Sequence, residues 1–295
     1  MRNKKILAFF LLSFACLCSL LLMAGAGWLS ANVRNHPIGS SQQLFQGITY
    51  TRETRNSPRL MIIHVITVDL RAESLGFLVT PGDPNMELPL KARTTSQFLA
   101  DFSVQVAVNG DGFTPWRSNS VLDYYPHPGD PVKPAGLAAS LGKVYSSGAS
   151  GLPTLYISQN NRASINNPPG KIYNAISGTA MLVRNGRVVN GLDGGPEPRT
   201  ALALDRRNRK MLVVVVDGRQ PDYSQGATLA ELAQIILEYQ GYNAINLDGG
   251  GSTALVFENR DGSPQLLNAP IDNQLPGRER PVGNHLGIFA RRTEE

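Results

Sequence analysis

Apolar residues in this chain occur mainly in short β-branched runs, which are typical of strands. The run at 60–70, LMIIHVITVDL, is apolar and partly alternating, and LGFLVT follows it after a turn. Side chains of this kind fit the pleated, half-buried surface of a sheet. The same pattern predicts further strands at 104–109, 179–184, 200–204, 211–216, 244–247, 255–257 and 285–290.

Two segments show helical periodicity. Residues 94–102 predict a short helix capped by Thr94. Residues 228–240 predict a longer helix, in which Thr228 is the cap and Glu231 stands three residues later, before Gly241 ends it. Its apolar face consists of Leu229, Leu232, Ile235, Ile236 and Tyr239.

Strands therefore surround one strong helix, without a regular alternation of strands and helices. This order predicts an α+β fold, with a mixed or antiparallel sheet and a few packed helices. We expect one catalytic domain over residues 45–292.

A long segment at 114–134 is rich in proline and aromatic residues and has no periodicity. Loops of this length inside a compact domain are uncommon and are more often functional than not. The alternative is a surface loop that packs on its own aromatic rings.

The N-terminus predicts export. Arg2, Lys4 and Lys5 precede 24 uncharged residues at 6–29. This run is either a signal peptide, cleaved at an Ala-x-Ala site at 24–26, or an uncleaved anchor. It is long enough for the second role, since about 20 apolar residues cross a bilayer. Either interpretation exports the remainder, and the anchor makes the membrane a partner. Residues 30–44 are polar and turn-prone and predict a tether.

The net charge of +5 does not indicate nucleic-acid binding. Without residues 1–29 the count is 25 basic against 23 acidic residues, which leaves +2. No block of lysines and arginines remains that could neutralise a phosphate backbone. Nucleic acid is therefore excluded as a partner.

Cysteine and histidine usage excludes two classes of site. The only cysteines, Cys16 and Cys18, lie inside the apolar run, so the exported body has no disulfide, cysteine nucleophile or cysteine–zinc site. The four histidines show no metal-ligand spacing, which argues against a zinc hydrolase. Ser252 lacks the G-x-S-x-G setting of a nucleophilic serine.

The segment 246–253, NLDGGGST, is the strongest candidate site. A predicted strand leads into an aspartate followed by three glycines, which let backbone approach a ligand closely. The alternative is a tight turn, although a turn rarely needs three glycines beside so many polar residues. The candidate residues are Asn246, Asp248, Gly249, Gly250, Gly251, Ser252 and Thr253.

Three weaker motifs also follow or begin strands. Asp217 and Arg219 end the run at 211–216, which is either the rim of a cleft or a surface turn with an ion pair. Arg199 begins the strand at 200–204. Residues 109–113, NGDGF, are either a second polar loop or a simple hairpin turn.

Together these motifs offer carboxylates, arginines and glycine-rich loops. Carboxylates serve acid–base or glycosyl chemistry, or bind a hard cation. Arginines and oriented N–H groups bind phosphate. A substrate that contains both a sugar and a phosphate would use both sets.

The order of these motifs resembles the phosphodiester glycosidase family. The resemblance spans roughly 104–290 and is densest over 198–256, from PRTALAL to DGGGSTALV. The NGDGF motif, Ile176-Ser177-Gly178 and the late segment at 279–284 also fit. One departure is that the family more usually has N-G-G-F/Y-F where Asp111 and Gly112 stand here. Asp111 is either an added functional carboxylate or a neutral variation.

The resemblance implies hydrolysis between the anomeric carbon of a sugar and a phosphodiester oxygen. Arg199 and Arg219 would hold the phosphate. Asp248 or Asp217 would act on the attacking water or stabilise an oxocarbenium-like centre. The expected substrate-binding residues are Asn109, Gly110, Asp111, Ser177, Gly178, Asn246, Gly249, Gly250, Gly251, Ser252 and Thr253.

Two alternatives remain open at this point. The protein could be a non-catalytic binder of envelope polysaccharide that uses the same loops. It could also be an envelope hydrolase in which Asp217 and Asp248 ligate Ca²⁺ or Mg²⁺. Our expectation is an exported hydrolase of glycosyl-1-phosphodiesters in envelope or extracellular glycans.

Overall fold

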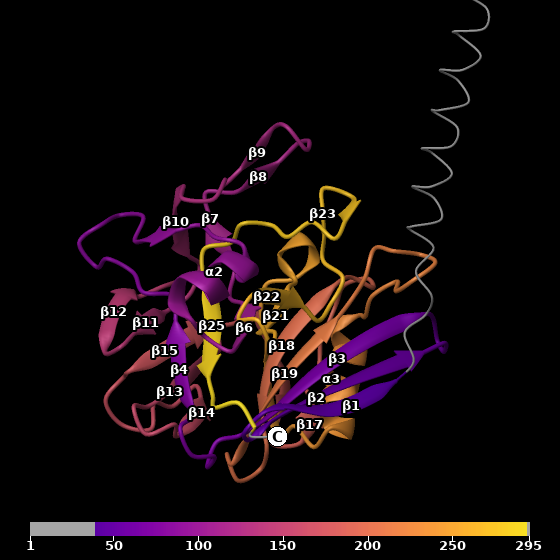
Figure 1. Cartoon of the computed structure of the whole chain (residues 1–295), viewed down its shortest axis with the longest axis horizontal. Helices are drawn as coiled ribbons and strands as arrows, with labels where there is room; N and C mark the ends of the chain where they lie inside the picture. Colours follow the sequence, from indigo (N-terminus) through magenta and orange to yellow (C-terminus); the bar gives the residue numbers. More distant parts are fainter. Residues whose placement is uncertain (1–38, 294–295) are drawn as a thin grey trace, which may run out of the picture. The chain divides into compact units, whose positions relative to one another are not determined.

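A computed structural model describes residues 39–293 and shows an antiparallel sheet of eight strands as its largest element (Figure 1). All neighbouring strands in this sheet run antiparallel. Their order across the sheet is β1 (Ser40–Phe45), β2 (Ile48–Arg55), β3 (Met61–Asp69), β19 (Lys210–Val216), β18 (Arg199–Leu204), β20 (Asn243–Asn246), β16 (Ala180–Arg184) and β17 (Arg187–Val188).

Two sheets of five strands accompany the largest one. The first has the order β22 (Pro264–Leu266), β21 (Leu255–Glu258), β6 (Val106–Asn109), β25 (His285–Phe289) and β4 (Gly76–Val79). The second has the order β12 (Lys143–Ser146), β11 (Ala138–Ser140), β15 (Asn174–Ser177), β13 (Thr154–Ile157) and β14 (Ala163–Ile165).

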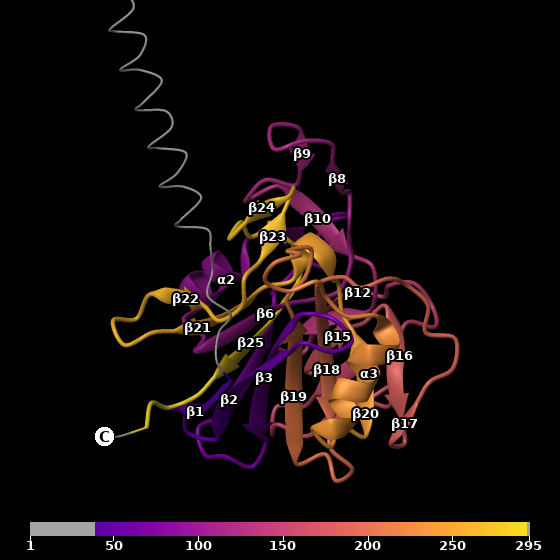
Figure 2. The same cartoon turned by 90° about the vertical axis from the view of Figure 1, so that its right-hand side faces the viewer.

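Three small sheets complete the strands of the described residues. They consist of β5 (Leu90–Lys91) with β10 (Pro131–Pro134) and β7 (Phe113–Thr114), β8 (Arg117–Ser118) with β9 (Tyr124–Tyr125), and β23 (Ile271–Asp272) with β24 (Leu275–Pro276). The β8–β9 hairpin projects beyond the larger sheets in both views, with β23 close to it (Figures 1 and 2).

Both predicted helices are present. They are α2 (Thr95–Phe102) and α3 (Leu229–Glu238), and Thr94 and Thr228 each form a capping box with the residue three positions later. Helix α3 covers one face of the eight-stranded sheet (Figure 2), and a 3₁₀ turn, η1 (Gly250–Ser252), follows β20.

Strand β19 shows why its sequence is continuously apolar. Its alternate residues face opposite ways, as in any strand. Leu212, Val214 and Val216 pack in the cluster that includes α3. Met211, Val213 and Val215 pack in the cluster that includes the five-stranded sheets. Because both faces are covered, an alternating polar pattern would be destabilising here.

The predicted α+β class was wrong. The described chain is 42% strand and 8% helix, and it has two α-helices, so it is mainly an antiparallel β protein. The error arose where strands are too short to show periodicity. The segment at 114–134, predicted as a loop, contains β8, β9 and β10, and its prolines and aromatic residues hide the alternation.

The predicted signal or anchor at 6–29 lies outside the described residues. Residues 40–44, the end of the predicted tether, belong to β1 and pair with β2. Within residues 39–293, neither helix has the length and apolar character needed to span a bilayer.

Candidate active site

The topology of the eight-stranded sheet brings three motifs to one edge. Strand β18 lies between β19 and β20 and is antiparallel to both. The start of β18 therefore meets the ends of β19 and β20. This arrangement places Arg199, Asp217 and Asp248 at the same end of these three strands.

Asp248 occupies the turn between β20 and η1. Its N–H donates to the Gly110 carbonyl at 3.0 Å, and its carboxylate accepts from the Gly249 N–H at 2.9 Å and from the Ser252 hydroxyl. The side chain is half-buried. Burial raises the pKa of Asp248, and these hydrogen bonds together with nearby arginines oppose that rise.

The three glycines after Asp248 make room for their neighbours. A Cβ on Gly249 would lie 2.7 Å from the Pro198 carbonyl oxygen, which accepts the Gly250 N–H at 2.9 Å. A Cβ on Gly250 would meet the guanidinium of Arg219, and one on Gly251 would collide with that of Arg280. The absence of side chains at these positions lets two cationic side chains approach the turn.

Arg219 and Arg280 flank this turn from different segments. Arg219 has a left-handed backbone, with φ 58°, and its Nε donates to Glu197 at 2.5 Å. Arg280 donates from Nε to the buried Asp272 at 2.8 Å and from Nη1 to the Ser252 hydroxyl at 3.4 Å. Two guanidinium groups beside one carboxylate form a cradle suited to a phosphate.

Arg199 begins β18, and its guanidinium bonds with two backbone carbonyls. Its Nε donates to the Ala227 carbonyl at 2.9 Å, and its Nη2 donates to the Gly195 carbonyl at 2.8 Å. Burial lowers its pKa, and the charge of Arg219 acts in the same direction. Arg199 thus connects the loop at Gly195 with the segment at Ala227, whereas Arg280 contacts the turn after Asp248.

Sequence reasoning did not select Arg280 as a site residue. A signal for it was present, because Arg280 lies in the segment at 279–284 that carries the family resemblance. An arginine in a turn-rich segment has no local pattern that distinguishes it. Its role depends on a contact with Ser252, 28 residues earlier in the chain.

Asp217 is enclosed by protein groups. Its side chain is 0% exposed, and its carboxylate accepts from the Asn268 amide at 3.1 Å and the Ala269 N–H at 2.9 Å. Its other oxygen bonds with His64 Nε2 at 3.0 Å, and His64 Nδ1 bonds with the Tyr50 hydroxyl at 2.8 Å. These contacts enclose the carboxylate of Asp217, whereas that of Asp248 is half-buried.

Asp111 lies behind Asp248 and is 1% exposed. Its carboxylate accepts from the Gly136 N–H and from the Asn284 side-chain amide, each at 3.0 Å. Burial raises the pKa of Asp111 to about 7; the two hydrogen bonds oppose this, and the charge of Asp248 adds to it. The two carboxylates therefore interact electrostatically, although Asp111 itself is covered.

Asn109 and Gly110 hold Asp248 in place. The Asn109 amide donates to the Asp248 carbonyl at 2.8 Å, and its oxygen accepts from the Thr200 hydroxyl at 2.8 Å. Gly110 donates to the Asn284 carbonyl at 2.7 Å. Both residues are buried, so they connect β6 to the Asp248 turn rather than line an open surface.

Four other predicted binding residues, Ser177, Gly178, Asn246 and Thr253, are also buried. The Ser177 hydroxyl donates to the Leu137 carbonyl at 2.9 Å, and Gly178 allows close contact with the Asn246 carbonyl. The Asn246 amide donates to the Thr179 hydroxyl at 2.7 Å, and Thr253 is 1% exposed. The structure therefore places these residues in the framework that supports the turn.

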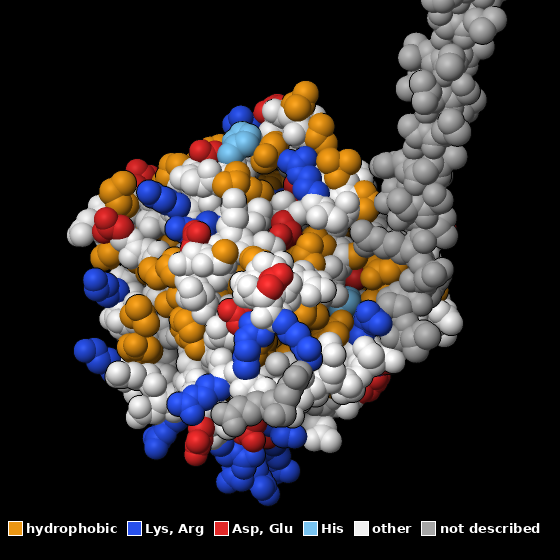
Figure 3. Space-filling view, viewed as in Figure 1, with side chains coloured by type: hydrophobic (Ala, Val, Ile, Leu, Met, Phe, Trp, Pro, Cys, Tyr) orange, Lys and Arg blue, Asp and Glu red, His pale blue; other side chains and the backbone are white. Residues whose placement is uncertain are grey.

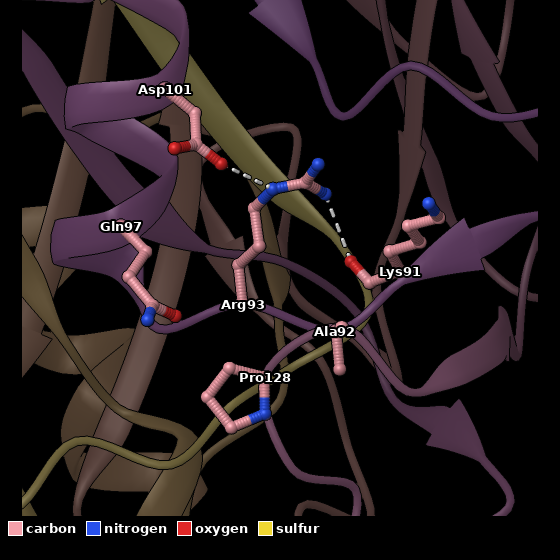
Figure 4. Close-up of a pocket in the computed structure, with 7 residues that line it drawn as sticks. Lys91, Ala92, Arg93, Gln97, Asp101 and Pro128 are labelled. Atoms are coloured by element: carbon pink, nitrogen blue, oxygen red, sulfur yellow. Dashed lines mark hydrogen bonds and ion pairs between the residues drawn. The ribbon is translucent and has the colours of Figure 1, made fainter.

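A separate cavity of about 220 Å³ lies beside α2 (Figure 4). Arg93 crosses it and donates to Asp101 at 2.8 Å and to the Lys91 carbonyl at 2.9 Å. Its lining contains none of the residues at 246–253. Across residues 39–293, no group of three or more His, Cys, Asp and Glu side chains has a metal-site arrangement.

Comparison with known proteins identifies a family. The model of the family described as phosphodiester glycosidase matches residues 102–289. The N-acetylglucosamine-1-phosphodiester alpha-N-acetylglucosaminidase of Bos taurus is 27% identical over 199 residues, which are 61% of this chain and 36% of that protein. The chain thus spans about a third of that relative's length.

Solved structures share the fold. The catalytic domain of the zebrafish N-acetylglucosamine-1-phosphodiester alpha-N-acetylglucosaminidase, auto-inhibited by its pro-peptide, matches with a TM-score of 0.59 and 24% identity. That match covers 87% of this chain and 85% of the other. A protein from Synechocystis matches with a TM-score of 0.57 and 18% identity, covering 87% of this chain and 64% of the other.

Proposed function

We propose, since the chain belongs to the phosphodiester glycosidase family, that it is a hydrolase of the bond between a sugar's anomeric carbon and a phosphodiester oxygen. The observation that carries the proposal is the position of Asp248 between Arg219 and Arg280. A carboxylate flanked by two guanidinium groups matches a substrate in which a reacting carbon is bonded to an anionic phosphate.

The arginines would bind the phosphate. Arg219 directs its Nη atoms over Gly250, and Arg280 approaches Gly251 and Ser252 from the other segment. Guanidinium groups form paired hydrogen bonds with phosphate oxygens. They also stabilise the charge that develops on the phosphate as the sugar–oxygen bond breaks.

Asp248 would act at the anomeric carbon. The bond from that carbon to the phosphodiester oxygen breaks, and the electron pair leaves with a phosphomonoester. A water oxygen bonds to the carbon, and Asp248 accepts the proton that this water loses. The carboxylate charge also stabilises the oxocarbenium-like centre between the two steps. Its raised pKa suits a group that takes up a proton.

The substrate class follows from the family and from the predicted export. The bovine relative is named for an N-acetylglucosamine-1-phosphodiester. For this chain we propose glycosyl-1-phosphodiesters of envelope or extracellular glycans, with the segment at 6–29 directing export or holding the protein at the membrane.

A release assay tests the proposal. The full-length protein is incubated with a panel of sugar-1-phosphodiesters, and free sugar and phosphomonoester are quantified. We expect release by the unaltered protein and a loss of roughly 100-fold or more in Asp248→Asn. Asp261→Asn, which alters an exposed aspartate in the β21–β22 turn, is the matched control and should retain full activity.

The remaining outcomes separate the alternatives. Binding of glycan without release of sugar from any diester would replace the enzyme by a polysaccharide binder. Loss of activity with a chelator, restored by Ca²⁺ or Mg²⁺, would assign a cation to Asp248. Unchanged turnover in Asp248→Asn would remove this residue from the mechanism.

A further inference from the structure

Exposed apolar side chains occur at the end of the molecule that carries β8, β9 and β23 (Figure 1). They lie on the β8–β9 hairpin, on the residue before it and on strand β24, and they are Trp116, Val121, Leu122 and Leu275. The Ser118 hydroxyl bonds with Asn273, which joins the two hairpins. The end of the molecule that carries β8, β9 and β23 shows apolar side chains next to basic ones (Figure 3).

Trp116 has the contact that links this patch to the site. The guanidinium carbon of Arg280 lies 5.1 Å from the centre of the Trp116 ring. The same guanidinium bonds with the Ser252 hydroxyl, which bonds with Asp248. One cationic side chain therefore separates the indole from the catalytic turn.

Much of the Trp116 indole is accessible to solvent, although the ring contacts Arg280. Its exposure is 51%, whereas Arg280 beside it is 14% exposed. An exposed aromatic ring at the edge of a charged site is characteristic of a surface that a ligand covers. The C–H faces of a pyranose ring stack on aromatic rings, and polar neighbours then bind its hydroxyls.

We propose that Trp116 is the platform for the second alcohol of the phosphodiester, and that this alcohol is a pyranose unit of a glycan. The inference rests on the proposed function. The phosphate between Arg219 and Arg280 carries two ester groups, and the anomeric carbon must lie at Asp248. The other group points to the far side of Arg280, where Trp116 lies.

A second pair of an arginine and an aromatic side chain lies beyond Trp116. Arg278 lies 4.6 Å from the centre of the Tyr124 ring and shares the buried carboxylate of Asp272 with Arg280. Alternating arginine and aromatic side chains supply both hydrogen-bond donors and apolar faces. This composition suits a sugar better than a plain alkyl chain.

Kinetics with two matched substrates test the platform. One is a sugar-1-phosphate esterified to a second sugar, and the other is its methyl ester. We expect Trp116→Ala to raise KM for the first roughly ten-fold, with little change in kcat, and to leave the methyl ester unaffected. Trp116→Phe should recover most of the loss, and Leu122→Ala, on the same hairpin, should show none.

Fluorescence supplies a readout that does not need turnover. The chain has two tryptophans, Trp28 and Trp116, so Trp28→Phe leaves a single indole. In the full-length protein carrying Trp28→Phe and Asp248→Asn, the disaccharide diester should shift the emission of Trp116. The methyl ester should not.

Each further outcome decides against the platform or against the function. Equal losses on both esters in Trp116→Ala would show that Trp116 only supports Arg280, and no loss on either would remove it from binding. If a long alkyl ester has as low a KM as the disaccharide diester, and Trp116→Ala raises it as much, the pyranose assignment is wrong. If no diester is hydrolysed, the proposed function fails, while the emission shift alone still decides the platform.

Discussion

The guanidinium of Arg219 lies over Gly250, with its Nη2 atom 2.8 Å from the point that a Cβ would occupy. Gly250 also has a left-handed backbone, with φ 59°. Two independent requirements thus meet at one residue, since only glycine provides both this conformation and this free space at low cost. The first prediction separates them.

We expect Gly250→Ala to lower turnover of a sugar-1-phosphodiester roughly ten-fold or more, because the new Cβ displaces Arg219 from the phosphate. The left-handed backbone should cost about 1 kcal/mol in unfolding free energy. Gly262→Ala is the control, because Gly262 has φ 86° and nothing within 4 Å of its Cβ position. It should lose similar stability and keep its activity. Equal activity in both variants would show that Arg219 does not need its present position.

Arg280 gives a second prediction. Arg280→Lys keeps the positive charge opposite Asp272 but loses the planar guanidinium that can form paired hydrogen bonds with phosphate. Turnover should therefore fall roughly ten-fold. Arg278→Lys is the matched control on the methyl ester, because Arg278 also pairs with Asp272 but lies beside Tyr124, in the region assigned to a second sugar that this ester lacks. Steady-state kinetics of the two variants measure the difference. Equal losses would mean that both arginines act through Asp272.

Local features of the fold were predictable from the sequence. The caps at Thr94 and Thr228 were found because their partners stand three residues away. The turn after β20 was found because its aspartate and glycines are consecutive. In both cases the pattern and its physical cause lie in one short segment.

Long-range features were not predictable. Asp217 follows a buried strand and looked catalytic, yet its partner His64 lies 153 residues away and encloses it. Asn109 looked like a ligand for substrate, but the Asp248 carbonyl, 139 residues later, takes its amide. Sequence spacing identifies which polar residues reach the end of a strand. It does not show whether they face a partner or an open surface.

The two aspartates yield a third prediction, because their surroundings differ. Asp217→Asn should lower the unfolding free energy by about 3 kcal/mol, because it removes the charge from a buried pair with His64. Its oxygen can still accept from the Ala269 N–H and the Asn268 amide, but its NH₂ group then faces His64. Asp248→Asn should change stability little and abolish most of the turnover. Denaturant unfolding and sugar release, measured on both variants, check this. A stable but inactive Asp217→Asn would return Asp217 to the catalytic set.

Asp111 makes a prediction about pH. Its pKa is raised from 3.8 to about 7 in the folded protein. Between these values the folded state holds a proton that the unfolded state has lost. The unfolding free energy should therefore fall as pH rises from about 4 to about 7, by up to about 1.4 kcal/mol per pH unit from this group. The effect should level off above pH about 7, where both states are ionised.

Comparing variants isolates this group from the other titrating residues. Asp111→Asn removes the proton uptake, so the difference in unfolding free energy between the unaltered protein and the variant should shrink or reverse as pH rises through that window. Asp222→Asn removes an exposed aspartate instead and should follow the unaltered protein in parallel. Asn at position 111 turns one amide hydrogen toward the donors Gly136 and Asn284, so some stability is lost at every pH. The slope, and not the offset, is therefore the decisive quantity: parallel curves for Asp111→Asn and the unaltered protein would show that Asp111 stays ionised inside the fold, held by those two donors against the charge of Asp248.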